Sequence, residues 1–100
     1  MPLILALDQG TTSSRAIVFD KFGRKLSQVQ IPLPQIFPHA GWVEQDAPLM
    51  WRNMLECAWQ AIADAGAKDA DVCALGVTNQ RETTIIWDRV TGEPLMNAIV

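Results

Sequence analysis

Eight consecutive residues near the N-terminus, between two apolar runs, have side chains suited to binding phosphate. The segment is 8–15 (DQGTTSSR). Gly10 lacks a Cβ, so the backbone can turn sharply and approach a ligand, while successive amides and the Thr and Ser hydroxyls can donate to phosphate oxygens. Asp8 can hold Mg²⁺, commonly through water, and the ion neutralises charge on a transferred phosphoryl group. The segment is neither a Walker A loop nor G-x-G-x-x-G, and an ordinary polar hairpin turn fits it equally well.

A second polar cluster, 79–83 (NQRET), follows another apolar run. Gln80, Arg81 and Glu82 together offer donors and acceptors suited to a polyol, because a carboxylate can accept from two hydroxyls while a guanidinium donates to a third. A solvated loop with a surface ion pair is the other interpretation. Adjacent residues of a strand point to opposite faces, so Arg81 and Glu82 can share one ligand only if the chain bends there.

The elements that must position these clusters begin with three strands. The continuous apolar run 3–7 predicts a strand buried on both faces, and the runs 16–20 and 25–31 predict two more. Short Gly-containing segments separate them, so the simplest arrangement is a three-stranded antiparallel meander with no helix before Gly41. The prolines between 32 and 42 predict an extended loop after it.

An amphipathic helix follows this loop. Asp46 is a good N-cap, Pro48 fits the first turn and Gly66 can end the helix. The predicted core face is formed by apolar residues that step by four and three, namely Trp51, Leu55, Ala58, Ile62 and Ala65. Two further strands are predicted, a buried one over 72–78 and another over 83–88.

Composition excludes several classes of function. Eight Lys and Arg against eleven Asp and Glu give a net charge of −3 without any basic run, so nucleic acid is not an expected partner. No apolar run approaches the ~20 residues that span a bilayer, and no signal peptide is evident. Cys57 and Cys73 lack metal or redox spacing and are expected to be reduced core thiols, and His39 to be a solvated structural residue.

Taken together, these segments make the chain resemble the N-terminal part of the FGGY carbohydrate kinases over essentially its whole length. Four blocks carry the resemblance: 7–15 (LDQGTTSSR), 41–46 (GWVEQD), 76–84 (GVTNQRETT) and 97–100 (NAIV). In members that phosphorylate xylulose the third block is of the Gly-Gln-Met-His-Gly type, so NQRET resembles the form of members that phosphorylate glycerol. Ala40 and Ala47 stand where the family usually has Pro, away from the proposed chemistry.

The resemblance implies an α/β fold of the ribonuclease H-like, actin-like ATPase type, with a mixed sheet in which an antiparallel strand meander is followed by a helix. It implies ATP and Mg²⁺ as cofactors and transfer of the γ-phosphoryl group to glycerol, giving sn-glycerol 3-phosphate and ADP. By the same resemblance, Asp8 would be the catalytic and metal-organising carboxylate, and Arg81 with Glu82 would bind glycerol. The nucleotide would be contacted by Thr11, Thr12, Ser13 and Arg15.

Residues 1–100 are therefore expected to be an incomplete N-terminal part of the first domain of a cytoplasmic, homo-oligomeric enzyme. The catalytic base and the second, adenosine-binding domain are expected beyond residue 100, so these residues alone are expected to be inactive. Two alternatives remain open: another member of the family that acts on a different polyol or ketose, and a non-catalytic actin-like module.

Overall fold

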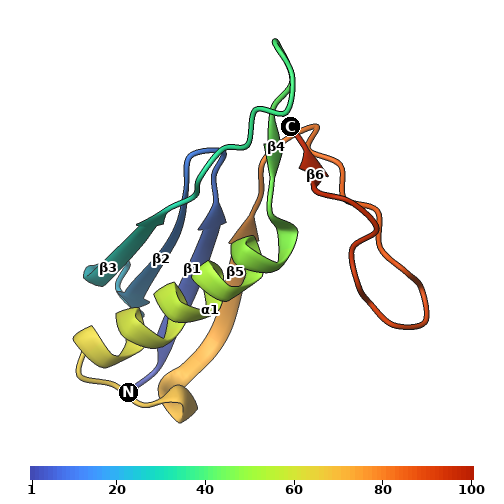
Figure 1. The fold of residues 1–100 in the computed structure, drawn as a ribbon. Coiled ribbons are helices and arrows are strands. Elements are labelled where there is room, and N and C mark those ends of the chain that lie inside the picture. The colour runs from blue at the N-terminus through green and yellow to red at the C-terminus, as the bar shows by residue number, and fades with distance from the viewer.

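The computed structural model describes residues 1–100, which form a four-stranded mixed sheet with one long helix across one face (Figure 1). The strand order is β3-β2-β1-β5, and a separate two-stranded ribbon pairs β4 with β6. The elements are β1 (Leu3–Gln9), β2 (Ser13–Asp20), β3 (Lys25–Pro32), β4 (Glu44–Gln45), α1 (Ala47–Asp64), a 3₁₀ turn (Asp69–Asp71), β5 (Val72–Thr78) and β6 (Ala98–Ile99).

The predicted antiparallel meander is confirmed. Strand β2 pairs antiparallel with both β1 and β3. The turn between β2 and β3 forms locally, because Asp20 Oδ1 accepts from the backbone amides of Phe22 and Arg24, both at 2.9 Å, and Gly23 takes a φ of 81°. The expected strand-turn-strand pattern therefore follows from signals close together in the sequence.

The helix is also confirmed, with its predicted ends. Asp46 accepts from the Leu49 amide at 3.1 Å, a proline lies in the first turn, and Gly66 follows the helix with a φ of 69°. Helix α1 packs on the sheet through a core in which every member is buried: Leu3, Leu5, Ala16, Val18, Cys57, Ala58, Ala61 and Ile62.

The predicted core face of this helix is confirmed at Ala58 and Ile62, which are buried in this core, and wrong at Trp51. Trp51 is 62% exposed, whereas its neighbour Met50 is buried. The buried face also includes Cys57 and Ala61, which the prediction did not name, because small side chains let helix and sheet approach closely. Trp59 is exposed as well.

Strand β5 forms as predicted but is not buried. It pairs in parallel with β1, and no strand pairs with its outer edge. Leu75 is 58% and Val77 69% exposed, because α1 packs over β1, β2 and β3 and does not extend over β5. Ile4 is exposed because it points to the face of the sheet that α1 leaves uncovered, so burial of the first strand on both faces was also wrong.

The predicted strand over 83–88 is absent. In its place the chain forms an irregular excursion, visible at the C-terminal end of the ribbon in Figure 1, in which isolated bridges join Thr84 to Ile99 and Trp87 to Pro94. Asp88 breaks the ladder, because its Oδ1 accepts from the Val90 and Thr91 amides and so closes a tight turn.

The remaining local expectations are mostly confirmed. Both cysteines are free, but only Cys57 is buried; Cys73 is exposed and therefore is not a core thiol. His39 is exposed and lies edge-on to Trp42, with ring centroids 4.6 Å apart. No helix of the chain combines the length and apolar character needed to cross a membrane.

Candidate functional site

The two polar clusters leave the sheet at the same end. Strands β1 and β5 are parallel neighbours, with Asp8 opposite Thr78, so the turn after β1 and the segment 79–83 both follow the carboxyl ends of adjacent strands (Figure 1). In α/β sheets this end is where ligands usually bind. The fold therefore brings together two clusters that are about seventy residues apart in the sequence.

The turn between β1 and β2 is held by its own backbone. The Gly10 amide donates to the Ser13 carbonyl at 2.9 Å, and the Leu33 amide donates to the Thr12 carbonyl at 2.8 Å. A Cβ at position 10 would lie 3.2 Å from the Ser13 carbonyl oxygen, so Gly fits this turn closely. Thr11 and Thr12 are exposed, and their hydroxyls make no hydrogen bond within the chain.

Two other residues of this cluster are already engaged. Ser13 Oγ accepts from Gln30 Nε2 at 2.7 Å. Arg15 Nη2 donates to Asp8 Oδ2 at 2.7 Å, and this pair is about one third exposed. Arg15 Nε is buried and makes no hydrogen bond within the chain.

Asp8 could hold a magnesium ion only as a single protein carboxylate, with the other ligands supplied from outside the chain. The chain has no cluster of three or more His, Cys, Asp or Glu side chains that could form a complete metal cage. Mg²⁺ at a phosphoryl-transfer site commonly takes one or two carboxylates, with waters and substrate phosphates completing the octahedron. A single half-exposed carboxylate beside a phosphate-type turn fits this mode of binding.

The second cluster contains the bend that the sequence required. Glu82 has a φ of 66°, the only positive φ outside glycine, so the chain does not run extended through Arg81 and Glu82. Both side chains are exposed and neither is engaged in an ion pair within the chain. They are free to contact one ligand from the same bend.

On sequence grounds Gln80 is a candidate side chain for binding a polyol. In the structure Gln80 is only 7% exposed, so its side chain is not open to a ligand. Its amide bonds to the side chain of Gln45, a fully buried residue that the sequence reasoning missed. The only signal for Gln45 was a polar residue directly before a helix cap, and this is too common to single it out.

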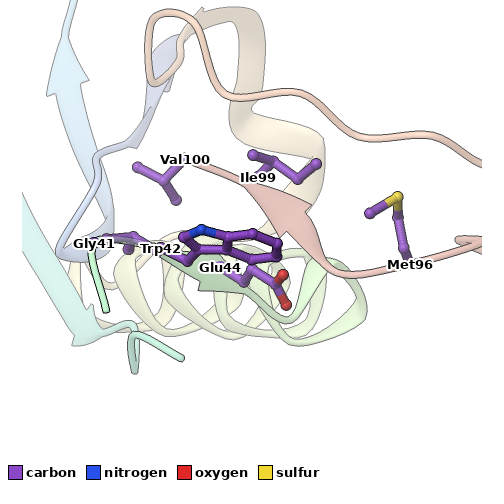
Figure 2. A pocket seen from close by; sticks show the side chains of 7 residues that line it. Gly41, Trp42, Glu44, Met96, Ile99 and Val100 are labelled. Carbon is purple, nitrogen blue, oxygen red and sulfur yellow. The ribbon is translucent and has the colours of Figure 1, made fainter. Parts of the chain in front are cut away.

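Two surface hollows lie near this end of the molecule. One, of about 360 Å³, is apolar and is lined mainly by Trp42, Met96, Ile99 and Val100 (Figure 2); it contains none of the predicted site residues. The other, of about 380 Å³, lies on the open face of the sheet and includes Asp8. Asp8 thus borders free space on the side of the sheet that α1 leaves uncovered.

The sheet order, the single covering helix and the hairpin turn after β1 are those of the ribonuclease H-like, actin-like ATPase fold, as expected. Comparison with known proteins gives the family. Residues 3–100 match the FGGY family of carbohydrate kinases, N-terminal domain. The chain belongs to the FGGY family of carbohydrate kinases.

Its relatives and structural neighbours agree with this assignment. The chain is 56% identical over 100 residues to a glycerol kinase of Polaromonas sp. strain JS666 and 60% identical over 99 residues to one of Rhodospirillum centenum. The structure of Plasmodium falciparum glycerol kinase with ADP superposes with a TM-score of 0.88 at 33% identity over the whole chain. A xylulose kinase of Lactobacillus acidophilus has a TM-score of 0.89 at 23% identity, which shows the shared fold. In each case the chain spans 20% of the relative.

Proposed function

We propose that the protein carrying this chain transfers the γ-phosphoryl group of ATP to a terminal hydroxyl of glycerol. The observation that carries the proposal is the convergence of Asp8 and the bend at Arg81 and Glu82 on one end of the β1–β5 pair. The relatives named glycerol kinase, with identities of 54% and above, support the substrate. The neighbour that binds ADP supports the nucleotide.

In this proposal the hairpin turn binds the donor. Thr11, Thr12 and Ser13 contact the nucleotide phosphates, and Arg15 lies beside ADP. Asp8 organises Mg²⁺, which supplies neutralisation of the charge on the phosphates. Catalysis by such a site is positioning together with electrostatic stabilisation, so each of these groups acts by holding charge and geometry in place.

The acceptor is bound by the second cluster. Glu82 accepts from glycerol hydroxyls and Arg81 donates to them, and the bend at Glu82 lets both side chains reach one small molecule. Both side chains are exposed, which supports this role because their donors and acceptors are accessible to a ligand.

The chain supplies only part of such a site. We propose that residues 1–100 are the first part of the N-terminal domain, and that the catalytic base and the adenosine-binding domain lie elsewhere in a protein of the relatives' length. We also propose that this protein is cytoplasmic and homo-oligomeric.

The proposal is tested by assaying ADP formation by the full-length protein with ATP, Mg²⁺ and glycerol, erythritol or xylulose in parallel. We expect kcat/KM for glycerol to exceed that for the other two by at least tenfold, which corresponds to about 1.4 kcal/mol of transition-state discrimination. A preference for xylulose would identify a different carbohydrate kinase. ADP binding without turnover on any acceptor would identify a non-catalytic module.

A further inference from the structure

Three side-chain hydrogen bonds connect the phosphate turn to the acceptor cluster. Gln45 Nε2 donates to the Thr11 carbonyl at 2.6 Å, Gln80 Nε2 donates to Gln45 Oε1 at 2.7 Å, and Thr83 Oγ1 donates to Gln80 Oε1 at 2.8 Å. Gln45 is fully buried and Gln80 is 7% exposed. We call this series of bonds, from Thr11 to Thr83, the glutamine relay.

The direction of the relay is fixed from one end. A backbone carbonyl can only accept, so the Thr11 oxygen requires the Nε2 side of Gln45. Gln45 must then present Oε1 to Gln80, which in turn must donate and present its own Oε1 to Thr83. Gln45 cannot turn over without losing both of its bonds, and turning over Gln80 would place its Oε1 against Gln45 Oε1, where neither oxygen can donate. A buried polar group without a partner costs about 1–3 kcal/mol. The relay therefore has a single arrangement.

The middle of the relay is built on rigid structure. Gln45 lies in β4, where it pairs with Ala98 of β6, and Asp46 immediately after it caps α1. Its two ends lie beside the proposed site residues, since Thr11 is in the turn itself and Thr83 follows Glu82. Displacement of either cluster relative to the other would break a buried bond, so the relay sets their relative position.

We propose that Gln45 is a positioning residue that holds the phosphate turn in register with the acceptor cluster. The inference rests on the proposed phosphoryl transfer. It goes beyond that proposal by assigning a role to a buried residue that contacts neither substrate. In-line transfer needs donor and acceptor in near-attack geometry, and a displacement of about 1 Å can cost on the order of 100-fold in rate.

The chain provides a matched control. Gln35 Nε2 also donates to the Thr11 carbonyl, at 2.8 Å, but Gln35 is half-buried and makes no bond to Gln80. Gln35→Met therefore removes a hydrogen bond from the same carbonyl without breaking the connection to the acceptor cluster. Gln45→Met removes the hydrogen bond to the Thr11 carbonyl and also the connection to Gln80, with little change in side-chain volume.

The test measures kcat and the KM values for glycerol and ATP in the full-length protein and its Gln45→Met, Gln80→Met, double and Gln35→Met variants. We expect Gln45→Met to lower kcat by roughly 10- to 100-fold, with much smaller changes in both KM values. We expect Gln35→Met to stay within about twofold of wild type. The double variant should resemble the worse single variant, because two residues acting through one relay are not additive.

Thr83→Val provides a readout that does not depend on disturbing the buried centre. It removes only the last bond of the relay at a half-buried position, and we expect a smaller fall in kcat with unchanged thermal unfolding. Equal kinetics for Gln45→Met and Gln35→Met, additive losses in the double variant, or a Thr83→Val enzyme with wild-type kcat would each overturn the relay. A wild-type protein that does not phosphorylate glycerol would instead overturn the proposed function.

Discussion

Asp8 and Arg15 lie directly opposite each other on β1 and β2, and Arg15 Nη2 donates to Asp8 Oδ2 at 2.7 Å. The ladder between these strands sets this pairing, so the acid proposed for the metal and the cation proposed for the nucleotide are held together before either ligand arrives. A half-exposed pair of this kind contributes little to stability. Its effect is on the site, since Arg15 orients the carboxylate.

Arg15→Met should weaken nucleotide binding without affecting glycerol. A hydrogen bond to a charged group is worth about 1.5–3 kcal/mol, so we expect the Kd for ADP to rise at least tenfold by isothermal titration calorimetry of the full-length protein. The control is Arg24→Met, which removes the other arginine–aspartate pair of the sheet. A similar loss of ADP affinity in both variants would contradict the assignment.

Asp8→Asn keeps an oxygen acceptor for Arg15 but removes the negative charge that we assign to Mg²⁺. We expect kcat to fall by roughly 100-fold, and part of the loss to be recovered at raised Mg²⁺, because the metal neutralises phosphate charge during transfer. Asp69→Asn, an exposed position just before the opposite end of β5, should behave as wild type. An unchanged Mg²⁺ requirement in Asp8→Asn would remove Asp8 from the metal site.

Arg81→Met should weaken the binding of glycerol and leave the binding of ATP unchanged. Loss of the guanidinium donors is expected to raise the KM for glycerol by about 10- to 100-fold, the cost of one or two charged hydrogen bonds, while the KM for ATP changes little. Arg89→Met removes another exposed arginine, from the excursion after the cluster, and should alter neither value. Parallel increases in both KM values for Arg81→Met would argue for a general structural role.

Glu82 is a proposed glycerol-binding residue and also has a strained backbone conformation. Its φ of 66° costs a non-glycine residue on the order of 1 kcal/mol. Both Glu82→Gly and Glu82→Ala should lose glycerol binding, but the glycine variant should be more stable than the alanine variant by about 1 kcal/mol. Denaturant unfolding of the two full-length variants measures this difference, and equal stabilities would show that the bend is not strained.

Asp20 should make stability depend on pH in the acid range. The pKa of this carboxyl is lowered, chiefly by the hydrogen bond from the Arg24 amide; burial opposes this effect, and the Arg24 side chain and the Phe22 amide add to it. A group whose pKa is lower in the folded state stabilises above its unfolded pKa, and this contribution is lost as pH falls through the folded pKa.

The corresponding measurement compares thermal unfolding of the wild-type protein and Asp20→Asn as a function of pH. The variant should be less stable at pH 7, and the difference should narrow below about pH 4 as the wild-type carboxyl takes up its proton. Glu56→Gln, at an exposed helix position, is the control. A difference that stays constant down to pH 2 would show that the ionised carboxylate is not what stabilises the turn.

The amino-acid sequence by itself determined the elements whose signals are local. The turn between β2 and β3 follows from Asp20 and Gly23, and the helix ends follow from Asp46 and Gly66, because each is closed by hydrogen bonds or a φ value within a few residues. The sequence also provided the residue types of both polar clusters. The roles of these residues in binding remain predictions.

Only the tertiary structure decided which surfaces are used. On α1 the predicted residues Ala58 and Ile62 are buried together with Cys57, whereas packing against the sheet left Trp51 exposed. The glutamine relay joins Gln45 to Gln80, 35 residues away, through side chains that any loop could carry. Such contacts depend on chain segments that meet only after folding, so no periodicity or local propensity marks them.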